Sequence, residues 1–185
     1  MKYDVLVVDP PWSYHKGAAP PRKRSEVKGG SGRGGRARDA YETMNAANFR
    51  EAFRIEDFAQ PNSHLYLWTT NPKLPLAFKV MSDWGYTYKT TLTWVKITKN
   101  EKVIKNGMGW FFRGATEHVL LGVRGKMGIP TALRKPNVIL AQRGRHSQKP
   151  DEFYELLDAI YPSESKIDVF ARKTRQGWDT WGDEV

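Results

Sequence analysis

The segment Tyr3–Val8 is a short, valine-rich apolar run that stops at an acid, two prolines and a tryptophan. An apolar run of this length that ends at turn-forming residues is typical of a buried strand. Pro10 and Pro11 fix two φ angles and remove two backbone donors, so the strand ends in a stiff turn. Asp9 is therefore expected at the carboxyl end of a buried strand, where ligands bind in open α/β sheets.

Apolar periodicity predicts strands and helices along the rest of the chain. The expected strands cover residues 63–69, 86–98, 117–123, 137–141 and 166–170. Three helices are expected: one that begins at residue 45, one over residues 72–84 and one over residues 150–160. The last has apolar residues at i, i+3, i+4 and i+7. Strands and helices alternate early and strands cluster later, which predicts an α/β fold with a mostly parallel sheet and some antiparallel pairing.

The length and charge of the chain narrow its function. Its 185 residues suffice for one domain with a sizeable core and are too few for two ordinary domains. A formal net charge of +10 favours a nucleic-acid partner over a basic surface that only aids solubility. No apolar run approaches the ~20 residues of a membrane helix and no signal peptide is recognisable, so the expected location is the cytoplasm, with no membrane partner.

The chain contains no cysteine, which excludes disulfides, thiolate–zinc sites and cysteine nucleophiles. Carbon methylation of cytosine proceeds through covalent attack by a cysteine, so that reaction is excluded as well. The four histidines lack the spacing of metal ligands, and no metal site is predicted.

The turn Asp9-Pro10-Pro11-Trp12 suits the binding of a planar group that carries an exocyclic amine. With two backbone donors removed, the turn offers two acceptors, the Asp9 carboxylate and the Pro10 carbonyl, and Trp12 adds a flat ring. The amine of adenine is a poor nucleophile because its lone pair is delocalised into the ring. Two acceptors on its hydrogens favour a tetrahedral nitrogen that can attack a methyl group without a covalent enzyme intermediate.

The chain resembles the MT-A70 family of S-adenosylmethionine-dependent adenine-N6 methyltransferases, whose signature is DPPW. Further segments match the family in the same order: AYETM at 40–44, SHLYLWTT at 63–70, WGY at 84–86, LTWVK at 92–96, GATEH at 114–118, GVRG at 122–125, HSQKPD at 146–151 and FAR at 170–172. The resemblance covers nearly the whole chain except residues 16–39. It implies a single Rossmann-like methyltransferase domain over residues 1–185, with helices on both faces of the sheet and the catalytic strand ahead of the cofactor-binding part.

The resemblance also implies which residues act. The catalytic turn comprises Asp9, Pro10, Pro11 and Trp12. Lys149 precedes an expected helix, where a cation is unfavourable unless it holds an anion, and in the family this lysine lies near the carboxylate of the cofactor. The tail resembles the ribose-binding end of the family, although it reads Gly-Asp-Glu where asparagine commonly follows the glycine. The candidate cofactor-binding residues are Asp9, Lys149, Phe170, Arg172, Thr174, Asp183 and Glu184.

Residues 17–38 are rich in Gly, Pro and Arg and contain few side chains that could be buried, so we expect a mobile loop. This loop is either a solvated linker or an arm that binds phosphates. Its G-x-G-x-x-G match lacks a preceding strand, which argues against a dinucleotide site. The candidate nucleic-acid-binding residues are Arg22, Lys23, Arg24, Arg33, Arg36, Arg38, Tyr41 and His146. Glu117 matches the glutamate of the family, and its role is open between orienting active-site groups and capping a buried arginine.

The sequence therefore predicts an adenine-N6 methyltransferase that acts on nucleic acid, with DNA favoured over RNA because the chain is compact and has no RNA-reading module. This compactness is typical of bacterial or phage modification enzymes. A duplex substrate would require the target base to flip out. Cytosine-N4 methylation and a non-catalytic nucleic-acid-binding subunit are the alternatives. The oligomeric state is open between monomer and homodimer.

Overall fold

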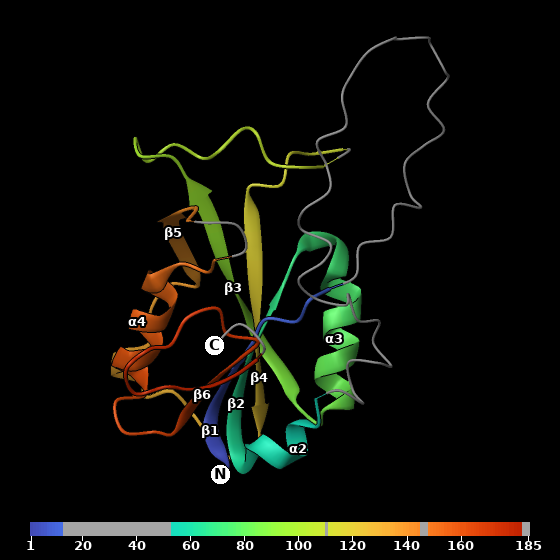
Figure 1. The fold of residues 1–185 in the computed structure, drawn as a ribbon, viewed down its shortest axis with the longest axis vertical. Coiled ribbons are helices and arrows are strands. Elements are labelled where there is room, and N and C mark those ends of the chain that lie inside the picture. Colours follow the sequence, from blue (N-terminus) through green and yellow to red (C-terminus); the bar gives the residue numbers. More distant parts are fainter. Residues whose placement is uncertain (13–52, 110, 145–147, 183–185) are drawn as a thin grey trace.

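The computed structural model describes residues 1–12, 53–109, 111–144 and 148–182. These residues form one seven-stranded sheet with the strand order β5-β3-β4-β2-β1-β6-β7 (Figure 1). The strands are β1 (Tyr3–Val8), β2 (Ala59–Thr69), β3 (Thr87–Ile97), β4 (Thr116–Arg124), β5 (Val138–Gln142), β6 (Lys166–Val169) and β7 (Asp179–Trp181). β4 pairs antiparallel with both β2 and β3, and the other neighbouring strands are parallel.

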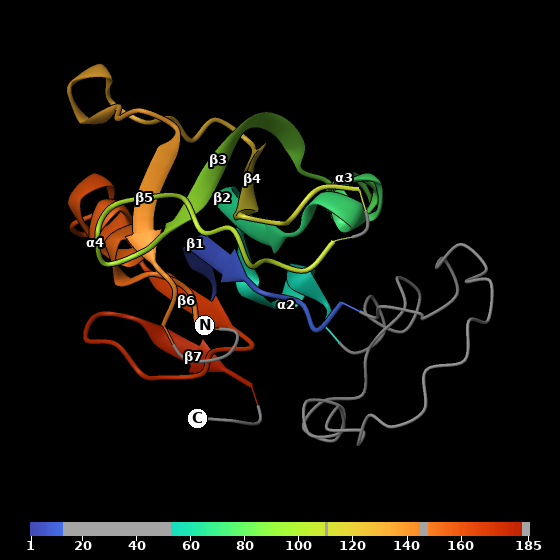
Figure 2. The ribbon, with the colours of Figure 1, turned by 90° about the horizontal axis from the view of Figure 1, so that it is seen from above.

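Helices cover both faces of this sheet. α3 (Leu74–Asp83) lies on one side and α4 (Asp151–Ile160) on the other, as Figures 1 and 2 show. The side chains of β1 alternate between the two sides: Leu6 and Val8 pack with α3, and Val5 and Val7 pack with α4. Because β1 is buried on both faces, its residues from Val5 to Val8 are all apolar rather than alternating with polar ones. The shorter helical segments are α2 (Ile55–Phe58), η2 (Asn71–Lys73) and η3 (Thr131–Leu133).

The predicted fold class, an α/β Rossmann-like domain with a mostly parallel sheet, is confirmed. The predicted strands are present within a few residues of their expected bounds, although β2 begins four residues earlier, at Ala59. The helix predicted over 72–84 is a turn of 3₁₀ helix followed by α3, which Gly85 ends with a φ of 74°. Pro150 is the N-cap of α4 rather than its first helical residue. The helix predicted from residue 45 lies outside the described residues.

The carboxyl ends of the parallel strands, where ligands bind in open α/β sheets, lie together at one edge of the sheet. Val8, Thr69, Ile97 and Val169 end parallel strands at this edge, and β4 starts there because it runs in the opposite direction. Residues that follow β1, precede α4 or begin β4 therefore meet at the same place. Among the described residues, no helix has both the length and the apolar character that crossing a membrane requires.

Candidate active site

The turn after β1 is fixed by hydrogen bonds on both sides. The Asp9 backbone N–H donates to the carbonyl oxygen of Val169 at the end of β6, over 3.3 Å. The Trp12 backbone N–H donates to the Pro10 carbonyl over 2.7 Å, and the Trp12 indole N–H donates to the Trp68 carbonyl over 3.0 Å. Trp12 is only 7% exposed, so its ring anchors the turn to the core more than it presents a free face.

Lys149 joins two carboxylates at the carboxyl edge of the sheet. Its ammonium lies 3.0 Å from Asp9 Oδ2 and 3.0 Å from Glu117 Oε2. The three side chains come from the turn after β1, the start of β4 and the residue before the N-cap of α4. Their exposed fractions are 11% for Lys149, 17% for Glu117 and 20% for Asp9. The Asp9 carboxylate is thus held rigidly and still reachable from the edge.

A second lysine completes this charged cluster. Lys96 Nζ, near the end of β3, lies 2.6 Å from Glu117 Oε1. Each ammonium also lies close to an indole ring, with Lys149 5.0 Å from the centroid of Trp68 and Lys96 4.9 Å from that of Trp94. The four ionisable groups alternate in sign along the edge, in the order Lys96, Glu117, Lys149 and Asp9.

The cluster shifts the pKa values of its members in different directions. Burial raises the pKa of Asp9 above its usual value, although the charge of Lys149 opposes this. Burial also acts to raise the pKa of Glu117, but Lys149 and Lys96 outweigh it and the pKa is lowered. Burial would lower the pKa of Lys149, but Asp9 and Glu117 outweigh it and the pKa is raised. Glu117 and Lys149 are therefore firmly charged at neutral pH, and Asp9 is the carboxylate with the greater affinity for a proton.

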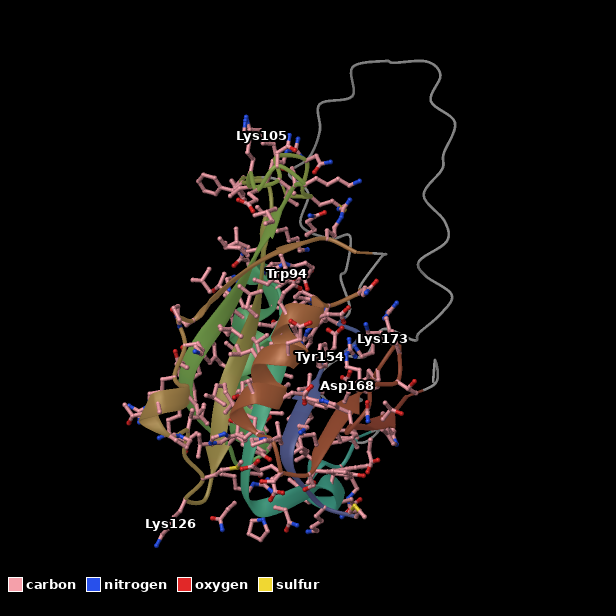
Figure 3. All side chains as sticks on the ribbon, turned by 90° about the vertical axis from the view of Figure 1, so that its left-hand side faces the viewer. Trp94, Lys105, Lys126, Tyr154, Asp168 and Lys173 are labelled. Carbon is pink, nitrogen blue, oxygen red and sulfur yellow. The ribbon has the colours of Figure 1, made fainter. Side chains whose placement is uncertain are left out.

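A second cluster fixes the segment that follows β6. Arg175 Nη1 lies 3.2 Å from Asp168 Oδ2, and the Arg175 guanidinium stacks 3.4 Å from the ring centroid of Tyr154 on α4. Lys173 and Arg175 both pair with Asp151, in the first turn of α4. Figure 3 shows Tyr154, Asp168 and Lys173 near one another at the end of β6. These contacts attach residues 171–178 to α4.

Replacement of Asp168 by asparagine is expected to reduce the pH dependence of stability. Burial raises the pKa of Asp168 to about 7 in the fold, whereas its ordinary value is 3.8. Between these values the folded state keeps a proton that the unfolded state releases, so the free energy of unfolding falls as the pH rises. Asparagine cannot ionise, so this fall is removed. Urea unfolding of both proteins at pH 5 and pH 8 measures the difference, and an identical pH dependence would contradict it.

The described part of the chain contains three more of the predicted cofactor residues. Phe170 follows β6 with a φ of 62°, and its N–H donates to the Trp181 carbonyl over 2.6 Å. A Cβ on Gly182 would lie 3.1 Å from Phe170 Cα, so the tail packs closely against this residue. Arg172 and Thr174 are exposed, and the charge of Arg172 acts to lower the pKa of Asp9.

The other predicted site residues lie outside the described residues. These are Arg22, Lys23, Arg24, Arg33, Arg36, Arg38, Tyr41, His146, Asp183 and Glu184. The predicted loop over residues 17–38 lies outside as well.

The sequence interpretation missed one member of the cluster and left the role of another open. Lys96 belongs to a segment that resembles the family, but no role was assigned to it. Its position, a charged residue near the end of an otherwise largely β-branched and aromatic strand, could have marked it as a candidate site residue. Glu117 had two open roles, and the described contacts are with two lysines rather than an arginine.

Among the described residues, no cluster of His, Asp or Glu suits a metal ion. His64 is buried, 2.5 Å from the Tyr161 hydroxyl.

Comparisons with known proteins show the family to which the chain is similar. The family model described as MT-A70 matches residues 3–184. The type II methyltransferase M.MunI from Mycoplasma sp is 30% identical over 195 residues, which cover 100% of this chain and 78% of that protein. The human N(6)-adenosine-methyltransferase catalytic subunit METTL3 is 28% identical over 189 residues, and a putative N(6)-adenosine-methyltransferase MT-A70-like protein of Medicago truncatula is 27% identical over 187 residues. The chain spans only 28% and 26% of these two longer relatives.

Proposed function

This chain belongs to the MT-A70 family, and we propose that it transfers a methyl group from S-adenosylmethionine to the N6 amine of adenine in nucleic acid, with DNA as the first substrate. The observation that carries the proposal is the partly exposed Asp9 carboxylate, which Lys149 holds at the carboxyl edge of the sheet. Relatives that are named N(6)-adenosine-methyltransferases support the choice of adenine N6.

The turn after β1 supplies two acceptors for the target amine. The Asp9 carboxylate accepts one N–H and the Pro10 carbonyl accepts the other. The Pro10 oxygen already accepts the Trp12 N–H, and this hydrogen bond fixes its direction while leaving a second lone pair for the amine. Two fixed acceptors draw the amine toward a tetrahedral geometry, so catalysis rests on orientation and electrostatics.

Asp9 also suits the removal of a proton from the product. When the nitrogen gains a methyl group it carries one proton too many, and that proton has to leave. The pKa of Asp9 is raised by burial, so its carboxylate takes up a proton more readily than an ordinary aspartate. Glu117 and Lys149 keep their charges and hold Asp9 in place during this transfer.

The charges at this edge fit S-adenosylmethionine, which carries a carboxylate, an ammonium and a sulfonium group. Lys149 offers a cation to the carboxylate, and Asp9 and Glu117 offer negative charge to the cationic groups. When bound, the cofactor supplies an electrophilic methyl group. Phe170, Arg172, Thr174, Asp183 and Glu184 are the further residues that we propose for its adenosine part, and the chain as a whole is proposed to be one methyltransferase domain.

Two observations support nucleic acid, and DNA within it. The net charge of +10 suits a polyanion. Among the relatives reported above, the type II methyltransferase is the one that the chain spans most fully, at 78% of its length. We propose that this polymer is contacted by Tyr41, His146, Arg22, Lys23, Arg24, Arg33, Arg36 and Arg38. RNA is the alternative substrate.

A methyl-transfer experiment tests this function. The purified protein is incubated with methyl-labelled S-adenosylmethionine and with duplex DNA, single-stranded DNA or RNA, and label in the polymer is counted. We expect label in DNA above RNA. Label in RNA alone would overturn the choice of DNA. A protein that binds nucleic acid but neither binds the cofactor nor labels any polymer would be a nucleic-acid-binding subunit rather than an enzyme.

A further inference from the structure

The described part of the loop between β3 and β4, residues 98–109 and 111–115, exposes large apolar side chains at the edge where the charged cluster lies. Met108 is 93% exposed, Phe111 is 95% exposed and Phe112 is 90% exposed. Single exposed apolar residues are common in soluble proteins, but three such side chains within five residues form a patch that favours an interaction site. We call the described residues of this connection, 98–109 and 111–115, the β3–β4 loop.

The backbone of this loop is fixed by hydrogen bonds. The Lys96 N–H donates to the Ala115 carbonyl over 2.8 Å, and the Ile104 N–H donates to the Lys96 carbonyl over 3.0 Å. Further out, the Gly114 N–H donates to the Met108 carbonyl over 3.0 Å. A Cβ on Gly107 would clash with the Gly114 backbone, so the two sides of the loop approach as closely as glycine permits. The loop therefore holds its apolar side chains outward on an ordered support.

The charge of the loop complements a polyanion. Its cations outnumber its acids, with Lys99, Lys102, Lys105 and Arg113 against the single acid Glu101. Figure 3 shows Lys105 at the end of the molecule beyond the carboxyl edge and Lys126 at the opposite end. The loop also connects directly to the site, because Lys96 precedes it and Glu117 follows it by two residues.

We propose that the β3–β4 loop contacts the nucleic-acid strand beside the target base. Phe111 and Phe112 stack on the unpaired bases that flank the target adenine. The phosphates of the same strand are contacted by Lys99, Lys102 and Lys105. Exposed aromatic rings flanked by cations are the combination that binds single-stranded nucleic acid, since every base has a face on which a ring can stack. The inference rests on the proposed function, because a flipped adenine leaves its neighbours in the strand partly unstacked.

The two phenylalanines are tested by direct binding. The double variant Phe111→Leu, Phe112→Leu keeps an apolar surface but loses both stacking faces, and Phe111→Trp keeps a ring. The dissociation constant for a fluorescent single-stranded oligonucleotide is measured by anisotropy for the full-length proteins. The leucine variant is expected to bind about 10-fold more weakly for each ring lost, and the tryptophan variant at least as tightly as the parent. Equal binding by the parent and the leucine variant would overturn the inference.

The cations are tested by the dependence of binding on salt. With the same single-stranded oligonucleotide, Lys105→Ala removes one expected phosphate contact, so the plot of the logarithm of affinity against the logarithm of salt concentration should become less steep by about 0.7. Lys126→Ala is the matched control, since it removes the same charge from the opposite end of the molecule, and its slope should equal that of the parent. Equal slopes for the two variants would contradict a phosphate contact at Lys105.

Two further readouts separate this inference from its alternatives. If the parent transfers methyl groups to adenine but the leucine variant binds nucleic acid normally, the inference fails and the proposed function stands. If the parent binds through the β3–β4 loop but transfers no methyl group, the proposed function fails instead. Sedimentation compares the oligomeric state of the parent with that of the leucine variant. A dimeric parent and a monomeric leucine variant would show that the loop contacts a second copy of the chain, and would overturn the inference.

Discussion

Replacement of Asp9 by asparagine is expected to lower the rate of methyl transfer by about 10²- to 10³-fold, as does the loss of one fixed electrostatic contact in other enzymes. Asparagine has the same shape, but it has no negative charge for the amine hydrogens and accepts no proton from the product. Lys149 keeps Glu117 as a partner, so the fold is expected to survive. The rate is measured at saturating cofactor and nucleic acid, with thermal unfolding as the check on folding.

The matched control for this variant is Asp57→Asn. Asp57 is a surface carboxylate with 60% of its side chain exposed, and it pairs only with the exposed Arg54 among the described residues. The control should therefore retain the activity of the parent. A rate for Asp9→Asn within a few-fold of the parent would show that the carboxylate does not take part in the chemistry.

Replacement of Lys149 by methionine is expected to destabilise the protein by about 3 kcal/mol, because it leaves two largely buried carboxylates without their shared cation. Glu117 keeps Lys96, but Asp9 loses the ammonium at 3.0 Å. The free energy of unfolding in urea at pH 7 measures this loss. Binding of S-adenosylmethionine, followed by calorimetry, is expected to weaken as well because the cation proposed for its carboxylate is gone.

A double variant distinguishes the charge effect from a loss of packing. In the background of Lys149→Met, a second change of Asp9→Asn removes the carboxylate that has lost its ammonium, while Glu117 keeps its ion pair with Lys96. Part of the lost stability should return, because less uncompensated charge is buried. A single variant as stable as the parent would contradict the view that Lys149 joins Asp9 and Glu117. A double variant that is less stable than the single variant would assign the effect to packing instead.

The parts of this structure that local sequence determines were predictable. The strand at Tyr3–Val8 and its stop at Asp9 follow from apolar side chains and two prolines. The helix α4 follows from apolar spacing and from acids in its first turn. These features depend on neighbours in the chain, so composition and periodicity are sufficient to predict them.

The charged cluster depended on strand order, which local sequence does not determine. Glu117 meets Lys149 because β4 lies beside β2 and runs antiparallel to it, so that its first residues reach the carboxyl edge. Periodicity shows that residues 117–123 form a strand but not which strands lie beside it or in which direction it runs. For the same reason Lys96 could be placed in a strand, but its ion pair with Glu117, which lies opposite Trp94 on the neighbouring strand, could not be predicted. β7 is three residues long, too short to give an alternating pattern.

The identity of the methylated nucleoside is the most direct test of amine methylation at Asp9. Polymer labelled by the parent protein is digested, and its nucleosides are separated and compared with those from the Asp9→Asn reaction. We expect the label in N6-methyladenine, and only about 10⁻² to 10⁻³ of that rate with asparagine. Label in N4-methylcytosine would keep the amine mechanism and overturn adenine as the target. Label on a ring carbon, or label in N6-methyladenine that Asp9→Asn leaves undiminished, would contradict the role of Asp9 itself.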